Sequence, residues 1–197
     1  VMAARIRLAK ESGMKLMELV RRDIRPSAIL TRKAFLNALA LDMALGCSTN
    51  SALHLPAIAN EVGIALNLAL VNEVSARTPN LCRLSPAGSF HVADLDEAGG
   101  VSAVLAQLLG AGLLHGGTMT VMGCTLAESV ADASILDERV IRPIGNPYSP
   151  TGGIAALWGN IAPNGCVVKQ SAVAPSMLVH RGPARVFDSE DESIAAI

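Results

Sequence analysis

Apolar residues recur at helical spacing through the first two thirds of the chain, and glycine, proline and polar capping residues divide them into segments. Gly13 interrupts the first apolar run, and Thr31 is a suitable N-cap for a later one. A short strand is predicted at Met119–Met122. Helices are predicted over residues 3–10, 14–20, 32–45, 51–59, 67–75, 101–109 and 126–133.

The pattern changes near Val140, where proline and glycine become frequent. Short β-type runs at 154–158, 166–169 and 184–187 alternate with turns, and Asn164-Gly165 is a strong turn signal. This alternation is typical of the opening of a β-barrel or sandwich.

The two ends of the chain suggest a longer parent protein. The first residues already lie in a helical pattern, and residues 188–197 form about one helical turn that Ser189 can cap. Because a natural chain rarely ends one turn into a helix, we expect an internal fragment.

The sequence Gly46-Cys47-Ser48-Thr49-Asn50 separates two apolar helical runs. Gly46 can end the first helix in the left-handed conformation, and Ser48, Thr49 and Asn50 are all strong N-cap residues for the second. A helix start favours anions such as a carboxylate or phosphate. The alternative is a simple corner between two helices.

Composition narrows the class of protein. The chain of 197 residues is 51% hydrophobic and 3% aromatic, so its core must consist of small aliphatic side chains. The net charge of −1, without a basic stripe, argues against nucleic acid as a partner. No apolar run reaches the roughly 20 residues that span a bilayer, so no membrane partner is expected.

The four cysteines are widely separated and include no C-x-x-C pair, so neither a zinc ribbon nor a redox dithiol is indicated. Free thiols in a cytoplasmic protein are the expected state of Cys47, Cys82, Cys124 and Cys166. A metal or cluster ligand at Cys47 is the alternative.

Several motifs, in order along nearly the whole chain, resemble the dihydroxy-acid/6-phosphogluconate dehydratase family. The stretch Leu53–Ala59 and the turn Ala162–Gly165 are more similar to the dihydroxy-acid branch. The motifs are Met17–Pro26, Gly46–Asn50, Asp96–Val101, Gly112–Gly116, Thr120–Glu128, Val140–Pro143, Ser149–Ile154, Gly159–Gly165 and Val167–Lys169.

This resemblance implies a fold and a reaction. The fold is α/β: residues 1–137 form the helix-dominated end of an α/β/α domain, and residues 138–197 begin a smaller β-barrel-like domain. The reaction is the dehydration of a 2,3-dihydroxy carboxylic acid to a 2-keto acid, as in branched-chain amino-acid biosynthesis. An iron–sulfur cluster would act on the leaving hydroxyl, Mg²⁺ would bind the carboxylate, and a serine would take the C2 proton.

The resemblance places the family's cluster and magnesium ligands, and its serine base, outside these 197 residues. We therefore assign no catalytic and no metal-binding residue, and expect this chain alone to bind neither cofactor. Ser48, Thr49 and Asn50 are the predicted substrate-binding residues. His54 is expected to be a core histidine, and His115 a turn residue with backbone hydrogen bonds.

Alternatives to this function remain open. Sugar-acid dehydratases, acting on aldonates or 6-phosphogluconate, share most of the motifs, and a non-catalytic homologous module is a different class of protein. The native mass of the protein would separate a truncated enzyme from a module. With a mean hydropathy of +0.41, the chain is also expected to form a homodimer or larger homo-oligomer.

Overall fold

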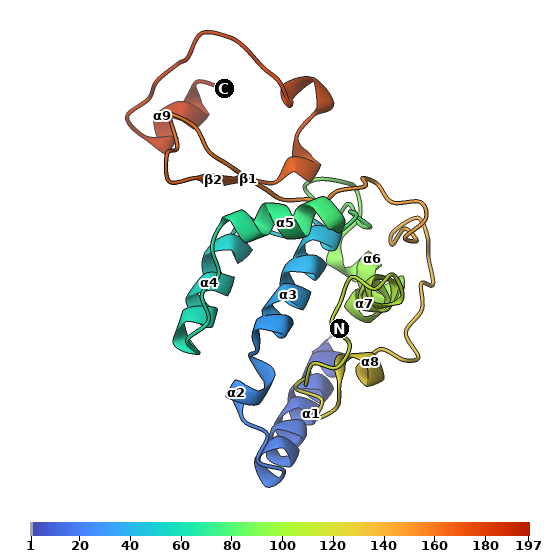
Figure 1. Cartoon of the computed structure of the whole chain (residues 1–197). Helices are drawn as coiled ribbons and strands as arrows, with labels where there is room; N and C mark the ends of the chain where they lie inside the picture. The colour runs from blue at the N-terminus through green and yellow to red at the C-terminus, as the bar shows by residue number, and fades with distance from the viewer. Residues whose placement is uncertain (1) are drawn as a thin grey trace.

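The computed structural model describes residues 2–197, and Figure 1 shows the arrangement of their helices and the small hairpin. The two short 3₁₀ turns span Gln170–Ala172 and Pro175–Met177. The helices and strands, in chain order, are α1 (Met2–Arg21), α2 (Pro26–Ile29), α3 (Arg32–Leu45), α4 (Ser51–Glu61), α5 (Ala69–Arg77), α6 (Val92–Glu97), α7 (Gly100–Gly110), α8 (Leu126–Ser129), β1 (Ala155–Leu157), β2 (Cys166–Val168) and α9 (Glu190–Ala195).

Helix α3 is central to the packing, because it contacts α4, α5 and α7. Its inner face carries the fully buried Met43, and the core continues through Leu81, Leu108, Ile141 and Ile154, all of which are fully buried. These side chains come from segments far apart in sequence, so one continuous aliphatic core joins the helical body to the start of the hairpin.

Several local predictions are confirmed. The Thr31 hydroxyl accepts a hydrogen bond from the N–H of Ala34 and caps α3, and the Ser189 hydroxyl accepts from the N–H of Glu192 and caps α9. Gly165, in the predicted turn, has φ of 93° and precedes β2. The capping and turn residues therefore act as their types predict.

Other local predictions are wrong. Helix α1 continues through Gly13, because an exposed glycine lowers helix stability by only about 1 kcal/mol. Residues 119–125 form a turn closed by an isolated bridge instead of a strand. Helix α8 ends at Ser129, and residues 184–187 are irregular because they have no neighbouring strand to pair with.

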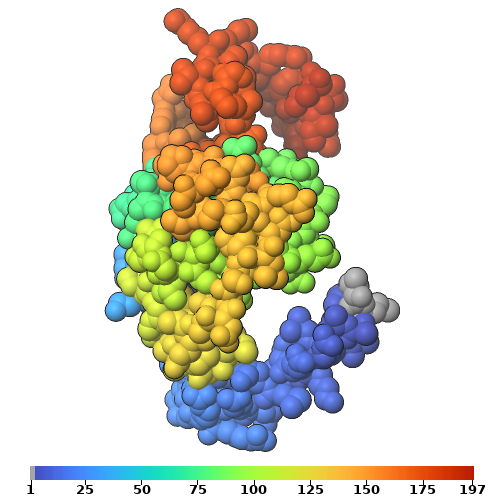
Figure 2. Space-filling view, turned by 90° about the vertical axis from the view of Figure 1, so that its right-hand side faces the viewer, coloured from blue at the N-terminus to red at the C-terminus, as the bar shows by residue number. Residues whose placement is uncertain are grey.

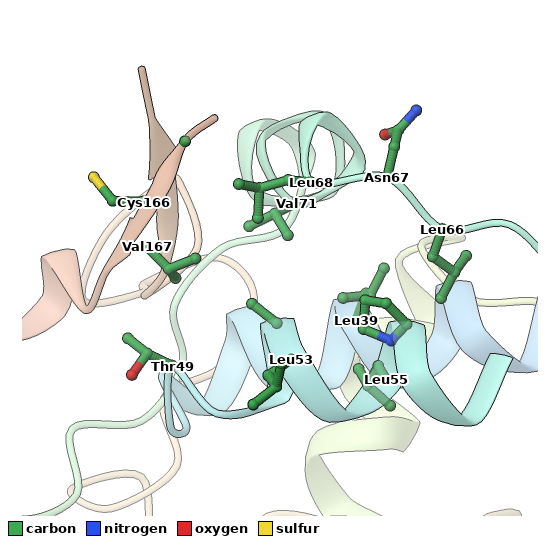
Figure 3. A pocket seen from close by; sticks show the side chains of 13 residues that line it. Leu39, Thr49, Leu53, Leu55, Leu66, Asn67, Leu68, Val71, Cys166 and Val167 are labelled. Carbon is green, nitrogen blue, oxygen red and sulfur yellow. The ribbon is translucent and has the colours of Figure 1, made fainter. Parts of the chain in front are cut away.

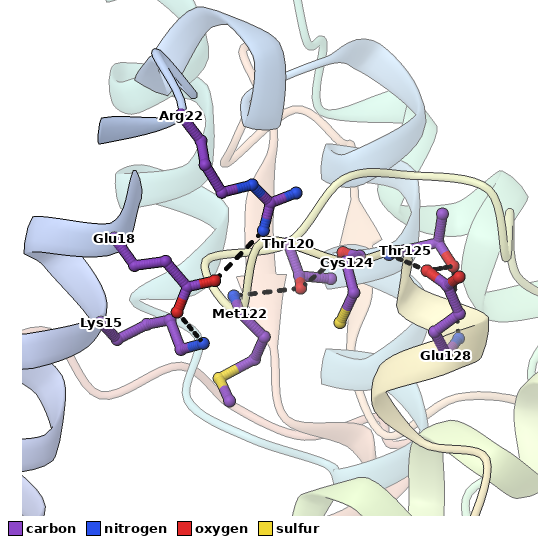
Figure 4. Close-up of polar contacts among 8 residues, drawn as sticks. All are labelled: Lys15, Glu18, Arg22, Thr120, Met122, Cys124, Thr125 and Glu128. Carbon is purple, nitrogen blue, oxygen red and sulfur yellow. Dashed lines mark hydrogen bonds and ion pairs between the residues drawn. The ribbon is translucent and has the colours of Figure 1, made fainter. Parts of the chain in front are cut away.

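The C-terminal end of α1 lies beside the turn 119–125 (Figure 4). Arg22 forms an ion pair with Glu18 at 3.2 Å, and a Cβ at Gly123 would lie only 2.5 Å from its guanidinium. The Thr120 hydroxyl donates to the Cys124 carbonyl at 2.9 Å and fixes the turn. The rest of α1 is largely exposed and projects from the body in the view of Figure 2.

Strands β1 and β2 pair antiparallel, with Ala156 opposite Val167. The free edge of β1 bonds to Asn72 of α5, whose side chain accepts from the N–H of Ala156 and donates to its carbonyl, both at 2.8 Å. The α/β/α arrangement and the barrel-like second domain stay predictions. No helix within residues 2–197 combines the length and apolar character needed to cross a membrane.

Candidate functional site

The corner between α3 and α4 begins at Gly46, which ends α3 as predicted. Gly46 has φ of 60°, a left-handed conformation that glycine adopts without steric cost. The N–H groups of Gly46 and Cys47 both donate to the carbonyl of Asp42, at 2.9 and 3.3 Å. The chain therefore leaves the helix direction within one residue.

The carbonyl groups in the last turn of α3 bond to residues from distant parts of the chain. The Asn80 side-chain amide donates to the carbonyls of Met43 and Ala44, at 3.3 and 3.0 Å. The N–H of Leu81 donates to Ala44, and the N–H of Gly153 donates to Met43, at 2.7 and 2.9 Å. Because a helix end leaves its last carbonyls without intrahelical partners, these bonds stabilise the corner.

The segment Ser149–Gly153 approaches this corner closely through its two glycines. A Cβ at Gly153 would lie 2.5 Å from the Gly46 Cα, and a Cβ at Gly152 would lie 2.6 Å from the Met43 Cβ. Glycine at both positions is therefore explained by the close approach of this segment to the end of α3.

Ser48, Thr49 and Asn50 form a turn that leads into α4. The carbonyls of Ser48 and Thr49 accept from the N–H groups of Ser51 and Ala52, each at 3.1 Å. The Ser48 hydroxyl accepts from the N–H of Asn50, which stands at the N-cap without a side-chain cap bond. Of the three predicted caps, only Ser48 therefore accepts a backbone N–H through its side chain, at the N-cap residue itself, and neither Thr49 nor Asn50 caps α4.

The polar groups of this turn are available to a ligand. Ser48 and Asn50 are exposed, and Thr49 is half-buried. Within residues 2–197 the Thr49 hydroxyl, the Asn50 side chain and the backbone N–H groups of Ser48 and Thr49 form no hydrogen bond. The three predicted residues therefore present hydrogen-bonding groups on one short turn.

Thr49 also lines an apolar pocket of about 420 Å³ (Figure 3). Leu53 and Leu55 contribute to its wall from α4, Val71 from α5, and Val167 from β2. The volume is in the range of small-molecule sites, and such sites are common where two parts of a fold meet. The turn and the pocket together form the candidate site.

The cysteines near this corner hold their protons tightly. Cys47 is exposed and Cys82 is buried. Desolvation is the first cause that raises the pKa of the Cys47 thiol, and the neighbouring Asp42 is the second. Burial likewise raises the pKa of Cys82 to about 12. Within residues 2–197, neither cysteine belongs to a group of three or more His, Cys, Asp or Glu side chains, so these two residues do not fit an iron–sulfur cluster.

Magnesium does not fit the described residues either. Within residues 2–197, no three His, Cys, Asp or Glu side chains come together as a metal ion would require. Neither cofactor that the family resemblance implies therefore has a ligand set in the part of the chain that the structure describes.

The prediction for His54 is wrong, whereas the prediction for His115 is confirmed. His54 was predicted to lie in the core, but it is exposed because α4 buries only Ala59 fully. His115 lies in a turn, as predicted, and its main chain bonds to Asn37: its N–H donates to the side chain at 2.8 Å and its carbonyl accepts at 3.1 Å.

Sequence reasoning missed three polar residues that shape the corner: Asp42, Ser51 and Asn80. Asp42 and Asn80 are 6% and 2% exposed. Asp42 offered a signal in the sequence, because it is an acidic residue within the apolar run of α3. A buried acidic side chain needs polar partners, so its position indicated that polar residues would lie nearby.

Family models and individual relatives both match this chain to the same group of proteins. Residues 1–129 match the model of the dihydroxy-acid/6-phosphogluconate dehydratase N-terminal region, and residues 139–197 match that of the C-terminal region. Dihydroxy-acid dehydratases from Acetivibrio thermocellus, Ruminiclostridium cellulolyticum and Caldicellulosiruptor bescii are 64%, 62% and 62% identical over all 197 residues.

The chain spans about 36% of the length of these three relatives. The two family models together match most of the chain, on both sides of residues 130–138. The chain therefore belongs to the dihydroxy-acid/6-phosphogluconate dehydratase family.

Proposed function

We propose that the full-length protein is a hydro-lyase that converts a 2,3-dihydroxy carboxylic acid to a 2-keto acid, and that this chain supplies part of its substrate site. The observation that carries this proposal is the identity of 64% over the whole chain to a protein named dihydroxy-acid dehydratase. The turn Ser48–Asn50 beside the pocket is the part of the site that we assign to this chain.

The turn suits the polar end of such a substrate. The first turn of α4 carries the positive end of a helix dipole, which favours a carboxylate. The free N–H groups of Ser48 and Thr49, with the two hydroxyls, can donate hydrogen bonds to an anionic oxygen. In this proposal the residues bind and orient the substrate, and they transfer no proton.

The pocket suits the carbon end of the substrate. Its wall consists mainly of Leu, Val, Pro and Ala side chains, with Thr49 and Asn67 as polar exceptions. A short branched aliphatic group can be buried there, whereas each hydroxyl of a sugar acid would need a polar partner. This lining favours an aliphatic dihydroxy acid over an aldonate.

The iron–sulfur cluster and Mg²⁺ of the proposed reaction belong, in this proposal, to other parts of the full-length protein. When bound, they would polarise the leaving hydroxyl and the carboxylate. Cytoplasmic location and a homo-oligomeric state stay predictions. The apolar residues along α1 are surface that an oligomer or further segments of the protein would cover, including Ile6, Leu8, Met14, Leu16 and Val20.

The test is to replace the hydroxyls in the full-length, cofactor-loaded enzyme. Ser48→Ala and Thr49→Ala should each lower kcat/KM for 2,3-dihydroxyisovalerate by roughly 10- to 100-fold, because each removes a hydrogen-bond donor to the anionic end of the substrate. Ser129→Ala removes an equally simple hydroxyl on α8, where it bonds to the Leu126 carbonyl, and serves as the control.

Thermal melts of the same variants show whether a loss of turnover reflects unfolding. Turnover unchanged in both Ser48→Ala and Thr49→Ala would refute the assignment of the turn. Faster turnover of an aldonate than of the aliphatic acid by the unmodified enzyme would instead refute the substrate class.

A further inference from the structure

The Ser51 hydroxyl connects the two helices that flank the candidate turn. Its oxygen lies 2.6 Å from Oδ2 of Asp42 and 2.7 Å from the carbonyl oxygen of Ser48. Asp42 is in the last turn of α3, and Ser51 is the first residue of α4. The backbone between them, which includes Thr49, is therefore held at both ends by one side-chain hydroxyl.

The number of hydrogens at Ser51 limits how these two contacts can form. A serine hydroxyl has one hydrogen, a backbone carbonyl can only accept, and an ionised carboxylate can only accept. With Asp42 ionised, one hydrogen would have to serve two acceptors. With Asp42 protonated, the acid donates to Ser51, and Ser51 donates to Ser48, so that each contact has its own hydrogen.

The surroundings of Asp42 favour the protonated acid. The side chain is 6% exposed, and its second oxygen, Oδ1, is buried without a hydrogen-bond partner within residues 2–197. It lies near the C-terminal end of α3, where the helix dipole disfavours a negative charge. Burial raises the pKa of Asp42, and this outweighs the opposing effects of Ser51, Cys47 and the Lys169 ammonium.

We propose that Asp42 is a positioning residue that, as a carboxylic acid, donates to Ser51 and thereby holds the Ser48 carbonyl and the turn Ser48–Asn50 in place. The chain of contacts runs from α3 through two side chains to the backbone of the turn. It keeps Thr49 on the wall of the pocket. This inference rests on the proposed function for its effect on turnover, but the contacts themselves can be tested without turnover.

The first experiment measures amide hydrogen exchange at Asn50–Leu53 in the full-length protein. Ser51→Ala should accelerate exchange there by roughly 2- to 10-fold, as expected for the loss of one hydrogen bond. Asp42→Asn should stay close to the unmodified protein, because an amide can still donate to Ser51. Asp42→Leu, which has similar volume and no polar atom, should behave like Ser51→Ala, while Ser129→Ala should leave these amides unchanged.

The second experiment tests the proton on Asp42 through the melting temperature. A carboxyl whose pKa is raised on folding binds its proton more tightly in the folded state, so stability falls as pH rises from the ordinary value of 3.8 through the raised pKa. Asp42→Asn does not titrate. The Tm of Asp42→Asn minus that of the unmodified protein should therefore grow as the pH rises above about 4.

The outcomes separate this inference from the proposed function. Unchanged exchange in Ser51→Ala would overturn the positioning role, and a Tm difference that is flat with pH would overturn the role of Asp42 as donor. Faster exchange with a lower kcat/KM in both Ser51→Ala and Ser48→Ala supports both proposals. A lower kcat/KM in Ser48→Ala with an unchanged value in Ser51→Ala would overturn the link to turnover, whereas unchanged kcat/KM in both Ser48→Ala and Thr49→Ala would refute the proposed site itself.

Discussion

At the corner between α3 and α4, the carbonyls of Met43 and Ala44 bond to Asn80, which is 37 and 36 residues away. In the segment 174–197, by contrast, the hydrogen bonds join residues within the segment itself. At the corner, the end of α3 from Met43 to Gly46 is buried, whereas no residue of 174–197 is buried. The segment 174–197 arches away from the helical body in Figure 1. Helix α3, which leads into the corner, and helix α9 of the segment both begin with the same kind of side-chain cap, at Thr31 and Ser189.

This difference shows what local signals can and cannot do. A cap or a turn residue chooses a conformation for a few residues, but buried contacts decide whether that conformation contributes to the stability of the whole protein. The corner should therefore unfold only with the core, and the segment 174–197 should open independently of it.

The largest expected change in the free energy of unfolding comes from removing a core side chain at the corner. Met43→Ala should lower the free energy of unfolding by about 2–5 kcal/mol, because Met43 is fully buried and the cavity cannot collapse completely. Val179→Ala, at a position 91% exposed, should change it by less than about 0.5 kcal/mol. Urea unfolding measures both, and equal effects would refute the contrast between the regions.

A smaller effect is expected where the two backbones meet. Gly153→Ala should lower stability by about 1–3 kcal/mol, because its Cβ would overlap with the Gly46 Cα. Gly159→Ala is the matched control, since a Cβ at Gly159 meets nothing within 4 Å. If thermal melts show the two variants to be alike, the close approach does not stabilise the corner.

The smallest effect compares one kind of cap in two settings. Thr31→Ala should lower the free energy of unfolding by about 0.5–2 kcal/mol, because α3 is packed in the core. Ser189→Ala removes the same kind of cap from α9, which buries no residue, so it should reduce helix content locally and leave the global transition unchanged. A global loss of stability in Ser189→Ala would mean that the segment unfolds with the core.

The candidate site could be predicted only in part. The turn Ser48–Asn50 was identified from residue types, and Thr49 does line a pocket. The way the turn is held could not be predicted, because Asn80 and Gly153 reach it from distant parts of the chain. The exposure of His54 was missed for the same reason, since an apolar helical stripe does not reveal which face finds a partner.

The sequence by itself determined the local events and the family. Thr31 caps α3, Gly46 ends it, and Ser189 caps α9, because these effects depend on a residue and its nearest neighbours. Only the tertiary structure decided that residues 184–187 form no strand, that His54 is exposed, and that Asp42 meets Ser51. Strand pairing and burial require segments that are far apart in the chain, and no local propensity encodes their meeting.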